Sequence, residues 1–199
     1  MTRRVVLGSA SPARLTTLRR AGLDPEVVVS GVDESMVTTE DPAALATELA
    51  VLKARAVAER VGDALVIGCD SVLAYDGRVH GKPHTAEEAT RRWHRMRGGS
   101  GVLHTGHCVV DHATGTEVAR TAATVVHFAD VTDEEIAAYV ATGEPLHVAG
   151  GFTLDGLGGA FVTGIEGDPH SVVGISLPLL RTMLAELGIT WTDLWRRAD

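Results

Sequence analysis

The first residues suited to chemistry follow a short predicted strand near the start of the chain. Ser9, Ser11 and Arg14 come directly after the predicted strand 4–8, and Pro12 follows Ser11. Serine is a favoured N-cap and proline is favoured at the first helical position, so a helix should begin here. The free N–H groups and dipole of a helix N-terminus attract phosphate, and an arginine in the first turn adds a bidentate donor. The alternative is an ordinary capped helix with a solvated arginine.

A carboxylate and a hydroxyl follow the most apolar segment of the chain. Asp70 and Ser71 come directly after the run 64–69, which is typical of a central strand covered on both faces. A carboxylate there costs free energy unless it is paired, hydrogen-bonded or bound to a cation. Asp70 is therefore a candidate for holding Mg²⁺ or for accepting a proton from water. If this strand is parallel to strand 4–8, both polar clusters face one crevice at the carboxyl ends of the strands.

Three further charged residues complete a set suited to a metal-bound polyphosphate. Glu34 follows the predicted strand 27–29, and Lys53 and Lys82 are the two lysines among 18 basic residues. The acids would hold a metal or activate water, and the cations would neutralise charge on a leaving group. These residues also have two ordinary, non-functional explanations. Glu34 and Lys53 are also typical of an exposed surface, and the scarcity of lysine is typical of a genome-wide compositional bias.

The composition narrows the class of protein. The chain has 199 residues, 45% hydrophobic and 22% charged, with a formal net charge of −8. This suits a globular chain that buries a core, and net acidity argues against non-specific binding to nucleic acid or an anionic membrane. No apolar run approaches the roughly 18 residues that span a bilayer, and the first apolar stretch is too short for a signal peptide. Cys69 and Cys108 form no disulfide framework, so we expect free thiols and a cytoplasmic protein.

The hydrophobic pattern predicts an α/β fold with a mixed sheet flanked by helices. We expect strands at 4–8, 27–29, 64–69, 102–111 and 117–128, the last two joined as a hairpin. Helices are expected to begin at Pro12, Pro42, Thr85, Thr132 and Leu177. Nine glycines lie between Gly143 and Gly174, which indicates close approach of the backbone to other groups there.

Several of these segments, in order along nearly the whole chain, resemble the motifs of the Maf proteins. Maf proteins are nucleoside triphosphate pyrophosphatases once described as septum-formation inhibitors. The matching segments are Leu7–Arg14, Val32–Glu34, Lys53–Ala54, Gly68–Val72, Asp76–Gly77, Gly81–Pro83, Thr105–Gly106, Tyr139, Gly143–Leu146, Ala149–Gly150, Gly156–Gly159, Val172–Gly174 and Leu177–Pro178.

The resemblance implies a fold and an activity. It implies one domain over 1–199, elongated and related to inosine triphosphate pyrophosphatases, with two lobes around a central cleft and a homodimeric assembly. It implies hydrolysis of a nucleoside triphosphate to the monophosphate and pyrophosphate with Mg²⁺ or Mn²⁺. The alternative is a nucleotide-binding regulator of cell division or septum formation that acts through a partner without turnover.

The resemblance also assigns roles to individual residues. On the matching positions, Asp70 would be the catalytic acid or base, and Glu34, Lys53 and Lys82 would complete the phosphate and metal site, with Asp70 and Glu34 as the metal ligands. Ser9, Ser11 and Arg14 would form the phosphate cradle, and Ser71 would join them in binding substrate. Asp155 stands where the pyrimidine-preferring branch has glutamine, and a carboxylate there suits a guanine edge. The preferred base stays open between a pyrimidine and a 7-methylguanine.

Overall fold

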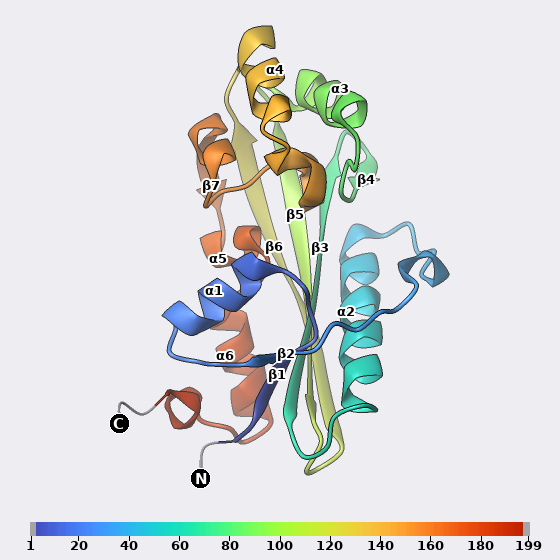
Figure 1. Cartoon of the computed structure of the whole chain (residues 1–199), viewed down its shortest axis with the longest axis vertical. Helices are drawn as coiled ribbons and strands as arrows, with labels where there is room; N and C mark the ends of the chain where they lie inside the picture. Colours follow the sequence, from blue (N-terminus) through green and yellow to red (C-terminus); the bar gives the residue numbers. More distant parts are fainter. Residues whose placement is uncertain (1–2, 197–199) are drawn as a thin grey trace.

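The computed structural model describes residues 3–196, which form a seven-stranded mixed sheet flanked by helices (Figure 1). The strand order is β2-β1-β3-β5-β6-β7, and β4 pairs with β3 outside this path. The strands are β1 (Val5–Leu7), β2 (Glu26–Val27), β3 (Leu65–Tyr75), β4 (Arg78–His80), β5 (Ser100–Asp111), β6 (Thr116–Phe128) and β7 (Val162–Glu166). β1 runs parallel to β2 and β3, and the other pairings are antiparallel. The predicted fold class is confirmed.

Side-chain caps start most of the helices. The α-helices are α1 (Pro12–Arg20), α2 (Pro42–Ala58), α3 (Ala86–Met96), α4 (Asp133–Ala141), α5 (Pro169–Val173) and α6 (Leu177–Glu186). Single 3-10 turns form η1 (Glu34–Met36), η2 (Glu144–His147), η3 (Ala149–Gly151), η4 (Leu157–Phe161) and η5 (Trp191–Leu194). Ser11, Asp41 and Ser176 each accept a backbone N–H three residues on, and Thr132 forms a reciprocal capping box with Glu135. These predicted starts are confirmed.

The central strand is longer than its apolar run indicates. β3 does not end at Asp70 and Ser71, as we expected, but continues to Tyr75. Asp70 and Ser71 interrupt the apolar run, so hydrophobicity alone predicts that the strand ends there. Hydrogen bonds to β5 from Leu65 to Ala74 nevertheless keep β3 extended. The segment 27–29 is shorter than expected, since β2 ends at Val27, and the short β4 was not expected.

The helices form layers at different levels of the long strands. Figure 1 shows α2 along one side of the strands, α1 and α6 on the other side, and α3 and α4 at the end opposite the β5–β6 turn. Three clusters of buried side chains result: one beneath α1 and α6, one beneath α3 and α4, and one beneath α2. Two of these cores lie toward opposite ends of the sheet, and the middle of β3 lies between them. Single-domain organisation with two lobes stays a prediction.

The glycine-rich segment is a series of tight turns rather than packed helices. A Cβ on Gly158 would overlap the Tyr139 hydroxyl, and one on Gly156 would overlap the Glu144 carboxylate. Backbone does approach other groups closely here, as the glycine count predicted.

No helix between residues 3 and 196 combines the length and apolarity that a bilayer crossing requires. Cys69 and Cys108 are buried free thiols.

Candidate functional site

The site surrounds a break in the pairing along one edge of β3. β1 pairs with Leu65–Ile67 and β4 pairs with Leu73–Tyr75. Between them, residues 68–72 pair with β5 on one side and with no strand of the described chain on the other. We call this stretch the edge gap. In the gap, the carbonyl oxygen of Cys69 accepts a hydrogen bond from Arg14 Nη1 at 2.9 Å instead of from a neighbouring strand.

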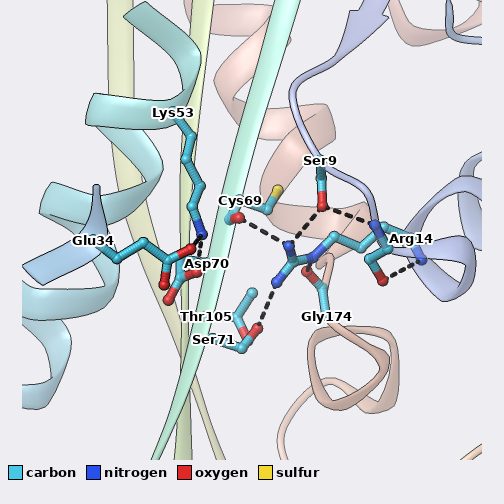
Figure 2. Close-up of polar contacts among 10 residues, drawn as sticks. Ser9, Arg14, Glu34, Lys53, Cys69, Asp70, Ser71, Thr105 and Gly174 are labelled. Atoms are coloured by element: carbon cyan, nitrogen blue, oxygen red, sulfur yellow. Dashed lines mark hydrogen bonds and ion pairs between the residues drawn. The ribbon is translucent and has the colours of Figure 1, made fainter. Parts of the chain in front are cut away.

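On one face of β3, an ammonium group joins two carboxylates. Lys53 Nζ lies 2.5 Å from Asp70 Oδ1 and 2.7 Å from Glu34 Oε1 (Figure 2). The side chains of Lys53 and Asp70 are 11% and 12% exposed, whereas that of Glu34 is 55% exposed. Asp70 is thus paired as a buried carboxylate must be, and its Oδ2 has no hydrogen-bond partner among residues 3–196. The interpretation of Lys53 as an exposed surface residue is wrong.

Lys53 reaches Asp70 because α2 lies directly on the sheet. A Cβ on Gly68 would overlap the Ala50 carbonyl oxygen, and one on Gly106 would overlap that of Ala46. The two glycines therefore let α2 approach, and Gly106 is the cross-strand partner of Asp70. Lys53 belongs to the buried stripe of α2, at 9% exposure.

Glu34 is brought to the site by η1. Asp33 caps this turn by accepting from Ser35 N at 3.0 Å, so its carboxylate bonds within its own segment. Glu34 is the carboxylate that pairs with Lys53. Burial alone would raise the pKa of Glu34, but the hydrogen bond and charge of Lys53, followed by the charges of Lys82 and Arg14, hold this pKa below its ordinary value. All three predicted cations therefore act on one carboxylate.

On the other face of β3, Arg14 binds four groups. Its Nε donates to Gly174 O at 2.8 Å, Nη1 donates to Ser9 Oγ at 3.0 Å as well as to Cys69 O, and Nη2 donates to Ser71 Oγ at 3.2 Å. A guanidinium has five N–H donors, so these bonds leave one on Nη2 for a ligand. The interpretation of Arg14 as a solvated arginine is wrong, because the side chain ties α1 to β3 and to the end of α5 (Figure 2).

Ser11 caps α1 as predicted. Its Oγ accepts from Arg14 N at 3.4 Å, and its own N–H donates to Ser9 Oγ at 3.2 Å. Ser9 Oγ thus receives two donors, one from the backbone and one from Arg14. These hydrogen bonds fix the conformation of the turn between β1 and α1 beside the edge gap.

The two polar clusters lie side by side, since β1 and β3 are parallel and Arg14 bonds Ser71, but only β1 ends there, whereas we expected the carboxyl ends of two strands. Successive residues of a strand point to opposite faces, so Asp70 lies on the α2 face and Ser71 on the Arg14 face. Both lie in the middle of β3. Both border the edge gap, so side chains from both faces of β3 lie next to backbone that pairs with no second strand of residues 3–196.

Lys82 and Asp155 lie on exposed segments. Lys82 lies in the loop between β4 and α3, and its charge acts on Glu34. Asp155 lies on an exposed bend before η4, and no hydrogen bond or ion pair in the described chain joins it to the edge gap. The structure thus brings together Ser9, Arg14, Glu34, Lys53, Asp70 and Ser71, places Lys82 within electrostatic reach, and leaves Asp155 apart.

Thr105 and His107 were not singled out as site residues, although both support the Arg14 face. Thr105 is fully buried; its Oγ1 lies 3.0 Å from Ser71 Oγ and donates to Ser171 O at 2.9 Å. His107 Nε2 accepts from Ser176 N at 2.8 Å, and burial, followed by the charge of Arg14, lowers the pKa of His107 to about 4. Their alternation with Leu103 and Val109 on one face of the predicted strand is the signal that would have identified them.

Comparison with known proteins places the chain among close relatives. A family profile described as "Maf-like protein" matches residues 4–187. A protein of Salinispora tropica is 60% identical over 199 residues, covering 98% of this chain and 88% of the relative, and one of Streptomyces coelicolor is 61% identical, covering 99% and 97%. Both are named nucleoside triphosphate pyrophosphatase, as is a 50% identical protein of Gloeothece citriformis that covers 98% of this chain and is itself covered completely.

Among solved structures, the Staphylococcus aureus Ham1 protein aligns with a TM-score of 0.42 at 15% identity. The alignment covers 64% of this chain and 73% of that one.

Proposed function

The chain belongs to the Maf family, and from this premise we propose that it hydrolyses nucleoside triphosphates to nucleoside monophosphates and pyrophosphate. The observation that carries the proposal is the buried contact of Lys53 with Asp70 and Glu34 beside the edge gap. Two carboxylates, held by one ammonium and bordered by Arg14, suit a reaction in which water attacks a polyphosphate.

Asp70 is the residue we assign as general base. Its Oδ1 is held by Lys53, and its Oδ2 is available to accept a proton from water. The oxygen of that water attacks the α-phosphorus as its proton passes to Asp70. The bond from the α-phosphorus to the α,β-bridging oxygen breaks, and that oxygen departs with pyrophosphate. The fixed position of Asp70 removes the need to reorganise the base during the reaction.

The cations at the edge gap take up the charge that develops on pyrophosphate. Lys53 is held by two carboxylates, Arg14 keeps one free N–H on Nη2 beside Ser71, and Lys82 lies on the loop after β4. Lys53 and Arg14 are fixed by bonds to other groups and Lys82 is not, so we assign them different roles. Arg14 and Ser9 orient the phosphates, whereas Lys82 is free to follow the departing group.

The donor set fits Mg²⁺ or Mn²⁺. Magnesium is commonly held by one or two carboxylates and the substrate's phosphates, and Asp70 and Glu34 offer hard oxygen ligands beside the phosphate cradle. No three His, Cys, Asp or Glu side chains of residues 3–196 gather as a larger ligand set, so a metal here would rely on the substrate for further ligands. When bound, the metal would neutralise charge on the phosphate oxygens.

The proposal extends to the choice of nucleobase. We propose that Asp155 contributes to base selection, because a carboxylate accepts from the N1–H and N2–H₂ of guanine but cannot donate to a pyrimidine carbonyl. A homodimer, a cytoplasmic location and the absence of nucleic-acid and membrane partners stay predictions from the sequence.

The test is a panel of canonical and modified nucleoside triphosphates assayed with Mg²⁺ or Mn²⁺, in which pyrophosphate and orthophosphate are scored separately. We expect one pyrophosphate per turnover, loss of activity on chelation and recovery on return of the metal. Orthophosphate as the only product would reject the proposal. Tight nucleotide binding without any product would instead favour a regulator that acts through a partner. An Asp155→Gln variant with an unchanged base profile would remove that residue from base selection.

A further inference from the structure

The loop that carries Lys82 is fastened to the fold on both sides of this lysine. The carbonyl oxygen of Gly81 accepts hydrogen bonds from Arg92 Nη1 at 2.6 Å and from Gly150 N at 3.1 Å. On the other side, His84 N donates to Leu146 O at 3.0 Å. The backbone around Lys82 is therefore anchored to α3 and to the glycine-rich segment.

The lysine side chain itself has no such support. Lys82 is exposed, and within residues 3–196 it makes no hydrogen bond or ion pair. A lysine has a flexible four-carbon stem with large rotamer freedom, so its ammonium group samples a wide volume. The centre of that volume is set by the backbone of the loop.

A strained residue shows that the loop conformation is imposed by its anchors. His84 has φ of +65°, in the left-handed region that residues other than glycine rarely adopt. Such a residue persists only where its surroundings determine the conformation. The Leu146 bond and the buried Pro83, which packs beside Gly151, supply that constraint.

Arg92 is itself held rigidly. Its side chain is 13% exposed, and its Nε donates to Glu88 Oε1 at 2.6 Å, one turn earlier in α3. The neighbouring Trp93 is buried and donates from Nε1 to Gly151 O at 2.8 Å, which docks α3 onto η3. The bond to Glu88 therefore fixes the guanidinium in the position from which Nη1 donates to Gly81 O.

We propose that Arg92 is a positioning residue for the reaction: it holds the Gly81 carbonyl so that the ammonium of Lys82 is delivered to the polyphosphate at the edge gap. Arg92 touches no part of the site and acts through the loop backbone. This inference rests on the proposed function, since it gives Lys82 its task.

Kinetics of Arg92→Ala and Arg91→Ala test the proposal, and Arg91 is a matched control. Arg91 pairs with the same Glu88, yet its side chain is 67% exposed and does not reach Gly81. Because small misplacements of catalytic groups cost up to about 100-fold in rate, we expect kcat/KM of Arg92→Ala to fall by about 10- to 100-fold, and that of Arg91→Ala to change less than about twofold. Equal effects of the two variants would overturn the proposal.

A double-mutant cycle separates positioning from a merely structural role. If Arg92 acts through Lys82, adding Arg92→Ala to Lys82→Ala lowers kcat/KM no further. Independent, multiplicative losses would overturn the proposal. Should Arg92→Ala fail to fold, Arg92→Lys enters the same cycle under the same criterion, because a lysine cannot bind Glu88 and Gly81 through separate nitrogen atoms.

An NMR signal of Lys82 tests the positioning role of Arg92 separately from the proposed hydrolysis, because it needs no turnover. With only two lysines in the chain, reductive ¹³C-dimethylation gives a Lys82 signal that Lys82→Arg identifies by its loss. We expect Arg92→Ala, but not Arg91→Ala, to move this signal toward its position in denatured protein. An unmoved signal overturns the inference whatever the activity. A moved signal in a protein that hydrolyses no nucleotide would uphold the positioning role and reject the proposed function.

Discussion

The carbonyl oxygen of Ala46 in α2 lies so close to Gly106 in β5 that a Cβ on this glycine would overlap it. Gly106 is also the residue paired with Asp70 across the sheet. The contact that seats α2 is thus adjacent to the contact that pairs Lys53 with Asp70. Helix packing and site chemistry depend on the same few atoms.

Gly106→Ala should therefore reduce stability and activity together. The added methyl must push α2 away from β5, and overpacking of this kind typically costs about 1–3 kcal/mol. Urea denaturation should show a lower midpoint, and pyrophosphate release should slow because Lys53 moves away from Asp70. Gly62→Ala is the control, since a Cβ on Gly62 would meet no atom within 4 Å. Wild-type stability of Gly106→Ala would contradict the close approach of α2.

Asp70→Asn should remove the general base while preserving the shape of the side chain. Loss of a general base lowers rates by about 10²–10⁴-fold, and we expect kcat to fall by this amount. Asp33→Asn is the control, because Asp33 lies next to Glu34 but bonds to Ser35 in its own turn. Near-wild-type turnover of purified Asp70→Asn would remove Asp70 from the role of base.

Lys53→Met should raise the pKa of Glu34. Burial raises this pKa, whereas the hydrogen bond and charge of Lys53 lower it, so removal of the lysine leaves burial less opposed. The carboxylate form, present in the wild type down to below its ordinary pKa, would then be lost at a higher pH. A ¹³C titration of the Glu34 carboxyl, assigned with Glu34→Gln, measures the change without requiring activity. Lys82→Met should shift the pKa in the same direction by less, and the reverse order would contradict the geometry.

His107 should make the fold less stable in mild acid. Burial, then the charge of Arg14, holds its pKa at about 4, below the ordinary 6.5, so the unfolded chain binds a proton between these values that the folded chain does not. Stability is therefore unaffected above pH 6.5 and falls as the pH drops toward 4, by about 2 kcal/mol at pH 5.

A His107→Gln variant tests this, because glutamine can still accept the Ser176 N–H but does not titrate. The difference between urea denaturation at pH 7 and at pH 5 should shrink by that amount in His107→Gln. The exposed His112→Gln should leave the difference unchanged. An equal difference in His107→Gln and the wild type would show that His107 titrates normally.

Local signals in the sequence predicted the helices and most strands, because caps and turns act within a few residues. Ser11, Asp41, Thr132 and Ser176 each satisfy a nearby backbone N–H, and each begins a helix where expected. Thr85 fulfils only half of a capping box: it accepts from Glu88 N, but the Glu88 carboxylate pairs with Arg91 and Arg92 instead. A four-residue motif does not include the other side chains that compete for its carboxylate.

The site itself depends on distant partners, which a local pattern does not encode. Lys53 pairs with Glu34 and Asp70 from separate elements, so its burial could not be predicted from its spacing within α2. The bonds of Arg14 to Cys69 O and Gly174 O likewise cross the fold. Residue types and the family resemblance identified this set, but the faces on which its members lie follow from the sheet.

The unpaired edge of β3 makes the chemistry dependent on strand register. Asp70 and Ser71 are neighbours on opposite faces, so a slip of β3 by one residue would exchange acid for hydroxyl at both positions without changing a single side chain. The ladder from Leu65 opposite Asp111 to Ala74 opposite Val102, continued by the β5–β6 hairpin, prevents that slip. Mutations that shift the β3–β5 register are thus a route by which this protein would keep its side chains and lose the chemistry at positions 70 and 71.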